Sequence, residues 1–223
     1  MRTTISIVNA ETQFASIFYI NSSFTVDWNL TPPLESASIN KAHSIGLAVA
    51  DFIATIFNKT GETYLDIHLV GISLGCEVAA SAARHVSELS GRKINRITGL
   101  DPTYYLINDG GDLRKLSAKN ADFVDVVHTN LSKRTGELEQ IGHVDFYVDD
   151  LGDNCNTKGK YSIKCDPLKS ITLFAKSVNS NDIKAKKCDS LEDFREGVCE
   201  NKEQVTFGEM VDKNVRGKYF LKY

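Results

Sequence analysis

The stretch that decides the fold is Ile67-His68-Leu69-Val70-Gly71-Ile72-Ser73-Leu74-Gly75. An apolar run typical of a buried strand leads into Gly-x-Ser-x-Gly, and an amphipathic helical pattern begins at once after it. This context predicts a strand, a sharp turn and a helix, with the Ser73 hydroxyl exposed above a sheet. The glycines are expected because strand and helix pass too close for side chains. The motif indicates a serine nucleophile, with the Leu74 N–H as a donor to an oxyanion.

Strand and helix patterns alternate around this motif. Apolar residues recur at helical spacing over 42–57 and 74–89, and the second helix is expected to stop at Gly91. Short runs of strand character lie at 24–28, 67–70, 97–100, 123–128, 144–147 and 219–221. The region 136–167 is predicted to form long loops. We therefore expect a single α/β domain over residues 1–223, with a mostly parallel central sheet and helices on both faces.

The composition argues against several kinds of partner. The chain has 223 residues, 42% hydrophobic and 25% charged, with a net charge of -3. Lysines are spread along the chain without interleaved aromatics, so we expect no nucleic-acid partner. No apolar stretch approaches the ~20 residues that span a bilayer, so no transmembrane segment is expected. The histidines are scattered, so neither a metal site nor a cofactor is predicted, and the oligomeric state is left open.

Other features point outside the cytosol. Four glycosylation sequons begin at Asn21, Asn29, Asn58 and Asn130. The five cysteines form two local pairs, Cys155 with Cys165 and Cys188 with Cys199, and a lone Cys76. This spacing fits two short-loop disulfides and a free thiol, whereas five reduced cysteines in a cytosolic protein are the alternative. The N-terminal residues do not have the pattern of a signal peptide, so we expect a secreted protein whose start lies before Met1.

Candidate partners for the serine follow it in the chain. Residues 97–100 form a short strand pattern that ends in Asp101-Pro102. In a Ser, Asp, His chain order, Asp101 falls where the triad acid belongs, although the same residue could simply cap a turn. His128 and His143 both follow Asp101 and would satisfy the order for a base.

Taken together, these segments resemble the neutral, pancreatic-type lipase family of α/β-hydrolases. The resemblance runs from about Phe24 to the C-terminus. Within the family, the chain is similar in particular to insect lipases, phospholipases A1 and yolk proteins. It rests on the runs 26–28, 67–75, 97–102, 123–129, 141–147, 188–199 and 216–221. It implies that Ser73 is the nucleophile, that Asp101 is the triad acid, and that no C-terminal β-sandwich domain is present. It also implies a lid disulfide, Cys155–Cys165, and a second disulfide, Cys188–Cys199.

The chain departs from the family pattern at the base. The family's histidine follows the second lid cysteine in a Cys-Ser-His-x-Arg pattern, and here that stretch reads Cys165-Asp166-Pro167-Leu168-Lys169. Proline occupies the histidine position, and the resemblance treats His128 and His143 as structural. The His-Gly loop that supplies the second oxyanion donor is not found before Phe24. We expect that loop, and the N-terminal strands, to lie at or beyond Met1.

These departures predict a lipase fold without ordinary lipase activity. Losing a triad member lowers turnover by about 10⁴ to 10⁶, and losing an oxyanion donor by roughly 10² to 10³. The expected function is binding of a lipid or small ester, or a secreted storage or interaction role. The alternative is an active secreted carboxylic ester hydrolase that works through an acyl-enzyme. The lid loop is short and polar, which favours phospholipid or small soluble esters over emulsified fat if the chain is active.

Cys76 lies on the first turn of the predicted helix after Ser73. One interpretation is a reactive thiol whose pKa is lowered by the helix N-terminus. The other, which we favour, is a small packed residue in place of alanine.

Overall fold

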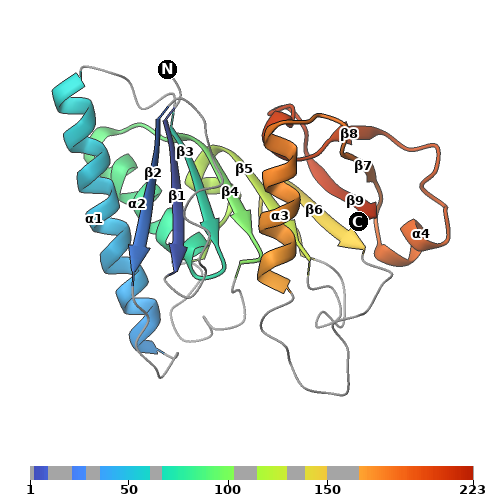
Figure 1. Ribbon diagram of the computed structural model, residues 1–223, viewed down its shortest axis with the longest axis horizontal. Coiled ribbons are helices and arrows are strands. Elements are labelled where there is room, and N and C mark those ends of the chain that lie inside the picture. Colours follow the sequence, from blue (N-terminus) through green and yellow to red (C-terminus); the bar gives the residue numbers. More distant parts are fainter. Residues whose placement is uncertain are drawn as a thin grey trace. The chain divides into compact units, whose positions relative to one another are not determined.

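The computed structural model describes residues 3–9, 22–28, 36–60, 67–102, 115–129, 139–149 and 166–222. The chain divides into two compact units, Met1–Val124 and Asp125–Tyr223. Each unit contains neighbouring strands together with helices (Figure 1). The strands are mostly parallel, which confirms the predicted fold class. The organisation as a single domain stays a prediction.

Four parallel strands, as far as the first unit is described, form a sheet before β5 begins. They are β1 (Thr3–Asn9), β2 (Ser22–Trp28), β3 (Ile67–Ile72) and β4 (Ile94–Leu100), in the spatial order β2-β1-β3-β4. Strand β3 is buried along its whole length and pairs with β1 on one side and β4 on the other. No sequence pattern predicts β1. Its apolar residues Ile5 and Ile7 alternate with threonine and serine, so the run is too short and too polar to stand out.

The described residues of the first unit contain two α-helices. Helix α2 (Gly75–Ser90) packs against β1, β3 and β4, and α1 (Ser36–Thr60) packs against α2. The helices approach closely at Gly46, where an added Cβ would lie 2.5 Å from the Ser81 Cβ. Helix α2 ends as predicted, because Gly91 adopts φ 66° and donates its N–H to the Ser87 carbonyl oxygen.

The second unit contains a mixed sheet. Strand β5 (Ala121–His128) begins at the unit boundary and is followed by β6 (Val144–Asp149), β7 (Lys184–Lys187), β8 (Gln204–Thr206) and β9 (Gly217–Lys222). Their order is β5-β6-β9-β7-β8, with β5, β6 and β9 parallel and β7 antiparallel to both β9 and β8. The helices are α3 (Asp166–Val178) and α4 (Leu191–Arg195). Two 3-10 turns complete the described elements, Ala118–Asn120 in the first unit and Gly208–Met210 in the second.

A disulfide and stacked aromatic rings stabilise one part of the second unit. Cys188 and Cys199 are bonded, which confirms the predicted second disulfide. They are buried in a cluster with Tyr147 and Phe220, whose rings stack at 5.1 Å between centroids.

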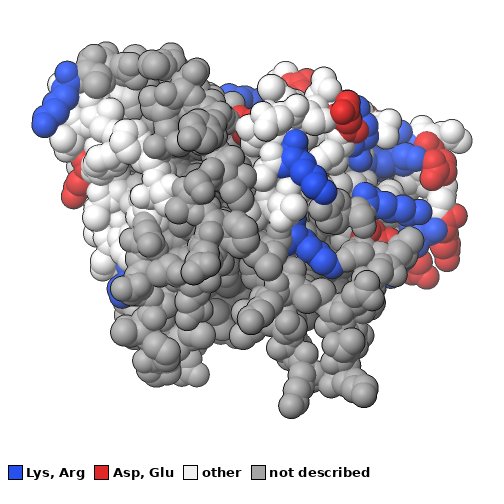
Figure 2. All heavy atoms as spheres, viewed as in Figure 1, with Lys and Arg blue, Asp and Glu red and all other residues white. Residues whose placement is uncertain are grey.

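Charged side chains of both signs are interspersed over β7, β8, β9 and α4 (Figure 2). Several form pairs, including Lys186 with Glu200, Lys187 with Glu203, and Arg195 with Asp149. This part of the surface is therefore built from paired charges of opposite sign.

Candidate functional site

The turn between β3 and α2 has the geometry that the sequence predicts. Ser73 is half-buried and adopts φ 53°, and its N–H donates to the Leu100 carbonyl oxygen at 2.9 Å. A Cβ on Gly71 would lie 2.6 Å from the Gly75 carbonyl oxygen and 2.7 Å from the Cys76 nitrogen. Any side chain at residue 71 would therefore push the helix away from the strand. The close approach explains why glycine precedes the turn.

Asp101 occupies the matching turn at the end of the neighbouring strand. It adopts φ 47° and is partly exposed. Strands β3 and β4 are parallel, and Ile72 pairs with Leu100, so Ser73 and Asp101 leave the sheet at the same edge. Among the described residues, these two are the non-glycine residues with positive φ. Such strained backbone concentrates at functional sites, and here it marks the two residues that the sequence singled out.

Leu74 is the N-cap residue of α2. Its carbonyl oxygen accepts hydrogen bonds from the N–H groups of Glu77 and Val78. Its own N–H lies at the positive end of a 16-residue helix, where a developing negative charge would be stabilised.

Strand β1 reaches the same sheet edge from the other side of β3. It runs parallel to β3, and Ile7 pairs with Gly71, so the end of β1 at Asn9 lies level with the turn that holds Ser73. Residues 10–21, which follow β1, lie outside the described part of the chain.

The predicted base position lies in the second unit. Pro167 is the second residue of α3, and the helix forms with proline there. A proline is tolerated in a first helical turn because the N–H groups of that turn have no acceptor within the helix. Pro167 is therefore compatible with the helix, but a proline side chain has no group that can accept a proton.

The five histidines of the sequence contact other parts of the protein. His68 is buried, with Nε2 2.7 Å from the Thr98 hydroxyl. His43 Nδ1 lies 2.8 Å from the Ser81 hydroxyl, and His85 lies near Glu88 and Asp51. The backbone oxygen of His143 accepts from the Gly217 N–H.

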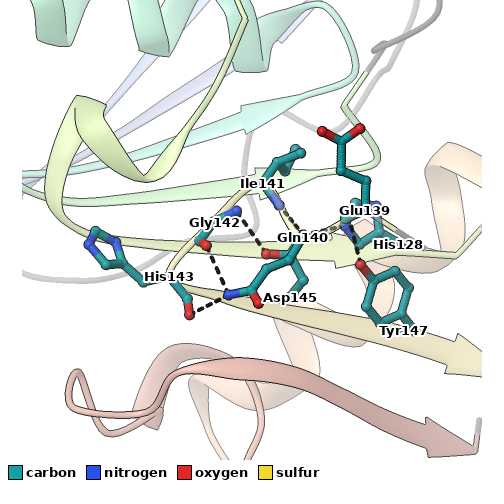
Figure 3. A network of polar contacts seen from close by, with 8 residues as sticks. All are labelled: His128, Glu139, Gln140, Ile141, Gly142, His143, Asp145 and Tyr147. Carbon is teal, nitrogen blue, oxygen red and sulfur yellow. Dashed lines mark hydrogen bonds and ion pairs between the residues drawn. The ribbon is translucent and has the colours of Figure 1, made fainter. Parts of the chain in front are cut away.

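His128 belongs to a buried polar network centred on Asp145 (Figure 3). Its Nε2 lies 2.7 Å from one carboxylate oxygen, and its ring stacks on Tyr147 with centroids 4.7 Å apart. The N–H groups of Ile141 and Gly142 donate to the same carboxylate at 3.2 and 2.8 Å. The network fixes the segment that leads into β6, which is a structural role for His128.

The structure decides between the two interpretations of Cys76. The thiol is fully buried and donates to the Gly71 carbonyl oxygen at 3.2 Å. Burial raises its pKa well above the ordinary value, and the neighbouring Glu77 raises it further. The interpretation as a reactive thiol of lowered pKa is therefore wrong, and Cys76 is a packed core residue.

Glu77 is the residue of interest that sequence reasoning missed. It lies in the first turn of α2 with only 4% of its surface exposed. Burial raises its pKa to about 7, although Arg84, Lys115 and a Leu116 backbone hydrogen bond favour the charged form. An acidic residue one turn after the serine, beside alanines and a cysteine, was the available signal in the sequence.

Several predicted site residues lie outside the described residues. These are Cys155, Cys165, Asn21, Asn29 and Asn130. Asn58 is described and lies exposed in the last turn of α1. The described residues contain no group of three metal-ligating side chains. Within the same residues, no helix has the length and apolar character that crossing a membrane requires.

Several known proteins are similar to this chain over most of its length. A family described as Lipase matches residues 21–222. Lipase member H of Rattus norvegicus is 35% identical over 183 residues, which cover 78% of this chain and 39% of that protein. Lipase member H-B of Xenopus laevis is 32% identical over 203 residues, covering 87% and 43%. Lipoprotein lipase of Homo sapiens is 31% identical over 197 residues, covering 78% and 40%. The chain thus spans about two fifths of the length of these relatives.

Proposed function

We propose a function for this chain from the premise that it belongs to the lipase family, as the match over residues 21–222 shows. In this proposal, the chain keeps the lipase nucleophile turn but hydrolyses esters at a severely reduced rate. It binds a lipid or a small ester, or serves as a secreted storage or interaction protein. The contrast between two positions supports the proposal: Ser73 and Asp101 are held in the strained turns, while Pro167 occupies the base position.

The chemistry explains why this contrast matters. In ester hydrolysis by a serine nucleophile, the Ser73 Oγ forms a bond to the carbonyl carbon while its proton passes to a base. The same base then returns that proton to the leaving alcohol as the acyl-enzyme forms. Proline cannot accept or return the proton, and loss of one triad member lowers turnover by about 10⁴ to 10⁶.

The sequence of β1 does not contain the family's second oxyanion donor. This strand ends in Val8-Asn9, followed by Ala10, and contains no His-Gly pair. We propose that the Leu74 N–H donates to the transition-state oxyanion, and we expect the family's His-Gly donor at or beyond Met1.

His128 is poorly suited to replace the base. Its Nε2 is committed to Asp145, and its Nδ1 is buried without a hydrogen-bond partner. Any displacement of the ring would break the Asp145 contact and the stack on Tyr147. We therefore assign His128 to the stability of the second unit.

The alternative function is that of an active secreted carboxylic ester hydrolase. The half-buried Ser73 and its positive-φ turn support it, and in this alternative Ser73 acts as the nucleophile and the Leu74 N–H as an oxyanion donor. This alternative needs a proton acceptor that substitutes for the missing histidine.

Labelling with a fluorophosphonate probe separates the two functions. The probe reacts only with an activated serine, so we expect no labelling of the folded wild-type chain above a Ser73→Ala control. Strong labelling that disappears in Ser73→Ala would overturn the proposal and establish an activated Ser73. Circular dichroism of both proteins confirms that each is folded.

Native mass spectrometry then distinguishes the binding roles. A lipid that co-purifies in a fixed ratio supports ligand binding. Purification without any ligand, together with no shift after incubation with phospholipid or fatty acid ester, contradicts it and favours the storage or interaction role.

We further propose that the chain is secreted, is glycosylated at its sequons, and closes its lid loop with a Cys155–Cys165 disulfide. Asn58 supports this, because it lies exposed and a glycan there would meet solvent. On expression through the secretory pathway, Thr60→Ala should remove one glycan unit from the mass, whereas Lys59→Ala, which keeps the sequon, should not. An unmodified Asn58 in the secreted wild type would contradict the assignment. A non-reducing peptide map tests the lid disulfide.

A further inference from the structure

A disulfide-closed loop of the second unit reaches back to the end of β6. Cys188 and Cys199 close this loop, which carries α4 between β7 and β8 (Figure 1). Arg195, the last residue of α4, donates from Nε to both Asp149 carboxylate oxygens, at 3.1 and 3.2 Å, and from Nη2 to one of them at 2.6 Å. Asp149 is the last residue of β6 and is buried. The loop therefore supplies a cation to a buried carboxylate of another element.

The contact with Arg195 compensates the burial of Asp149. A buried carboxylate is unfavourable unless a cation or several donors replace its hydration. Guanidinium and carboxylate groups match in shape, so a contact through two nitrogens is both strong and specific in direction. The Arg195 side chain is 49% exposed, whereas that of Asp149 is 1% exposed. Withdrawing Arg195 would remove this compensation and admit water on the side of Asp149 that the guanidinium now covers.

Helix α4 depends on its surroundings for its position. It has five residues, Leu191–Arg195, and all of them are at least partly exposed. A helix of this length is not stable by itself. Phe194 stacks on Phe220 with ring centroids 5.6 Å apart, and the disulfide lies in the same cluster. The bond and the stacked rings therefore hold α4 where its last residue can reach β6.

The strands on either side of the loop are held by contacts of their own. The Lys187 N–H donates to the Glu203 carbonyl oxygen at 2.8 Å, and the Cys188 N–H donates to the Lys218 carbonyl oxygen at 3.3 Å. These hydrogen bonds join backbone atoms that flank the loop and do not involve residues 189–198. Opening the disulfide should therefore free the loop while β7, β8 and β9 stay paired.

The disulfide also determines how often α4 is docked. Cys188 and Cys199 are 11 residues apart in the sequence. Closing a loop of about this length favours the closed arrangement by roughly 10²-fold. Both cysteines are buried, so a reductant reaches them only after α4 has moved. An exposed helix with few buried contacts opens locally more often than the core strands do.

We propose that the Cys188–Cys199 bond is a redox-controlled clasp on the end of β6. While the bond is intact, α4 is docked and Arg195 covers Asp149. A dithiol reductant attacks one sulfur as a thiolate, forms a mixed disulfide and then closes its own disulfide. Two electrons thereby pass to the protein, each cysteine sulfur ends with one proton, and the freed loop withdraws Arg195. Ligands of α/β sheets bind outside the carboxyl ends of strands, so the clasp acts at an edge where ligand contacts are expected.

Carboxyl labelling of the full chain with a carbodiimide and a small amine, located by tandem mass spectrometry, tests the clasp. In the disulfide-bonded wild type, Asp149 should label slowly, like the buried Asp145, whereas Glu88, with 74% of its side chain exposed, should label fast. In Cys188→Ala/Cys199→Ala, labelling of Asp149 should rise at least about ten-fold, because loop closure is lost, while Asp145 stays protected.

A pair of variants tests the role of Arg195. Arg195→Met in the disulfide-bonded chain should raise the labelling of Asp149 although the bond is intact. Lys222→Met is the matched control, because Lys222 lies over the Phe194 ring of the same helix and has no contact with Asp149. It should leave Asp149 as protected as in the wild type.

Redox control is tested on Cys155→Ala/Cys165→Ala, in which the lid cysteines cannot contribute. Dithiothreitol should raise the labelling of Asp149 in this folded protein, and alkylation should detect thiols at Cys188 and Cys199. The same measurement decides the question if Cys188→Ala/Cys199→Ala does not fold.

The proposal is overturned if Asp149 stays protected after reduction or in Arg195→Met. It is also overturned if Asp145 becomes labelled together with Asp149 after reduction, because the unit then unfolds as a whole. A Cys188–Cys199 bond that resists dithiothreitol in the folded chain would contradict the redox control.

Discussion

The turn at Ser73 and the first turn of α3 differ in what the fold requires of them. At the Ser73 turn, strand and helix are so close that a Cβ on Gly71 would lie within 2.7 Å of backbone atoms. At the start of α3, the helix accepts Pro167 because a first turn needs no N–H donor there. The first region is constrained by packing, whereas at the second the fold imposes no need for histidine.

This difference changes how the motif should be interpreted. The glycine before Ser73 is required for folding, so its presence says little about catalysis. The histidine position is the more informative one, because only proton transfer would keep an imidazole there. The Ser73 side chain is an intermediate case. The hydrogen bond to the Leu100 carbonyl oxygen uses the backbone N–H of Ser73, so it does not explain why residue 73 carries a hydroxyl group. An intact Gly-x-Ser-x-Gly is therefore compatible with a chain that has lost hydrolysis.

The largest effect on stability is expected at Gly71. Gly71→Ala places a Cβ against the backbone of Gly75 and Cys76, so the free energy of unfolding should fall by more than about 3 kcal/mol. Gly91→Ala is the matched control, because its Cβ meets nothing within 4 Å and only the positive φ opposes it. That variant should lose about 1 kcal/mol. Urea unfolding measures both, and equal losses would contradict the packing explanation.

The next effect concerns Glu77 and depends on pH. Its pKa is higher in the folded state, about 7 against 4.5, so its contribution to stability is fully present below pH 4.5 and is lost as the pH rises through 7. Residue 77 cannot ionise in Glu77→Gln. At pH 8, the free energy of unfolding of this variant should therefore exceed that of the wild type by up to about 3 kcal/mol. The two proteins should be similar near pH 4. Urea unfolding across this range would refute the buried-acid interpretation if the difference did not change with pH.

A smaller effect is expected at His128, the histidine that could have been mistaken for a base. His128→Phe keeps a ring against Tyr147 but removes a donor to the buried Asp145 carboxylate, lowering the free energy of unfolding by about 2 kcal/mol. His85→Phe loses only contacts to exposed acids and should change it by less than about 1 kcal/mol. Fluorophosphonate labelling should be the same in His128→Phe as in the wild type. A loss of labelling in His128→Phe alone would identify His128 as the missing base.

The sequence predicted the parts of the fold that have strong periodicity or a special turn. The strand and helix around Ser73, the stop at Gly91 and the Cys188–Cys199 bond were all correctly predicted. Strand β1 escaped prediction because threonine and serine interrupt its apolar residues, and β7 escaped because three of its four residues are lysine. These strands are stabilised by pairing with strands that lie far away in the sequence. A local sequence pattern does not indicate such pairing.

The sequence predicts which residues belong to the candidate site, but it does not predict how deeply the neighbouring side chains are buried. Chain order placed Ser73 and Asp101, and the structure puts both at one edge of paired strands. The raised pKa values of Cys76 and Glu77 arise from burial among distant residues, so the sequence offered no direct indication of them. The helix N-terminus beside Cys76 suggested a lowered pKa, but desolvation has the larger effect.

The most direct test of the central claim is to restore the base and measure ester hydrolysis. Initial rates on p-nitrophenyl butyrate are compared for the wild type, Pro167→His, Pro167→Gln and the double variant Pro167→His/Ser73→Ala. General-base catalysis contributes about 10² to 10⁴, so Pro167→His should hydrolyse the ester at least about 10²-fold faster than the wild type. That gain should vanish in the double variant and be absent in Pro167→Gln. Equal Ser73-dependent rates in the wild type and in Pro167→His would show that the chain already has a base and would contradict the account.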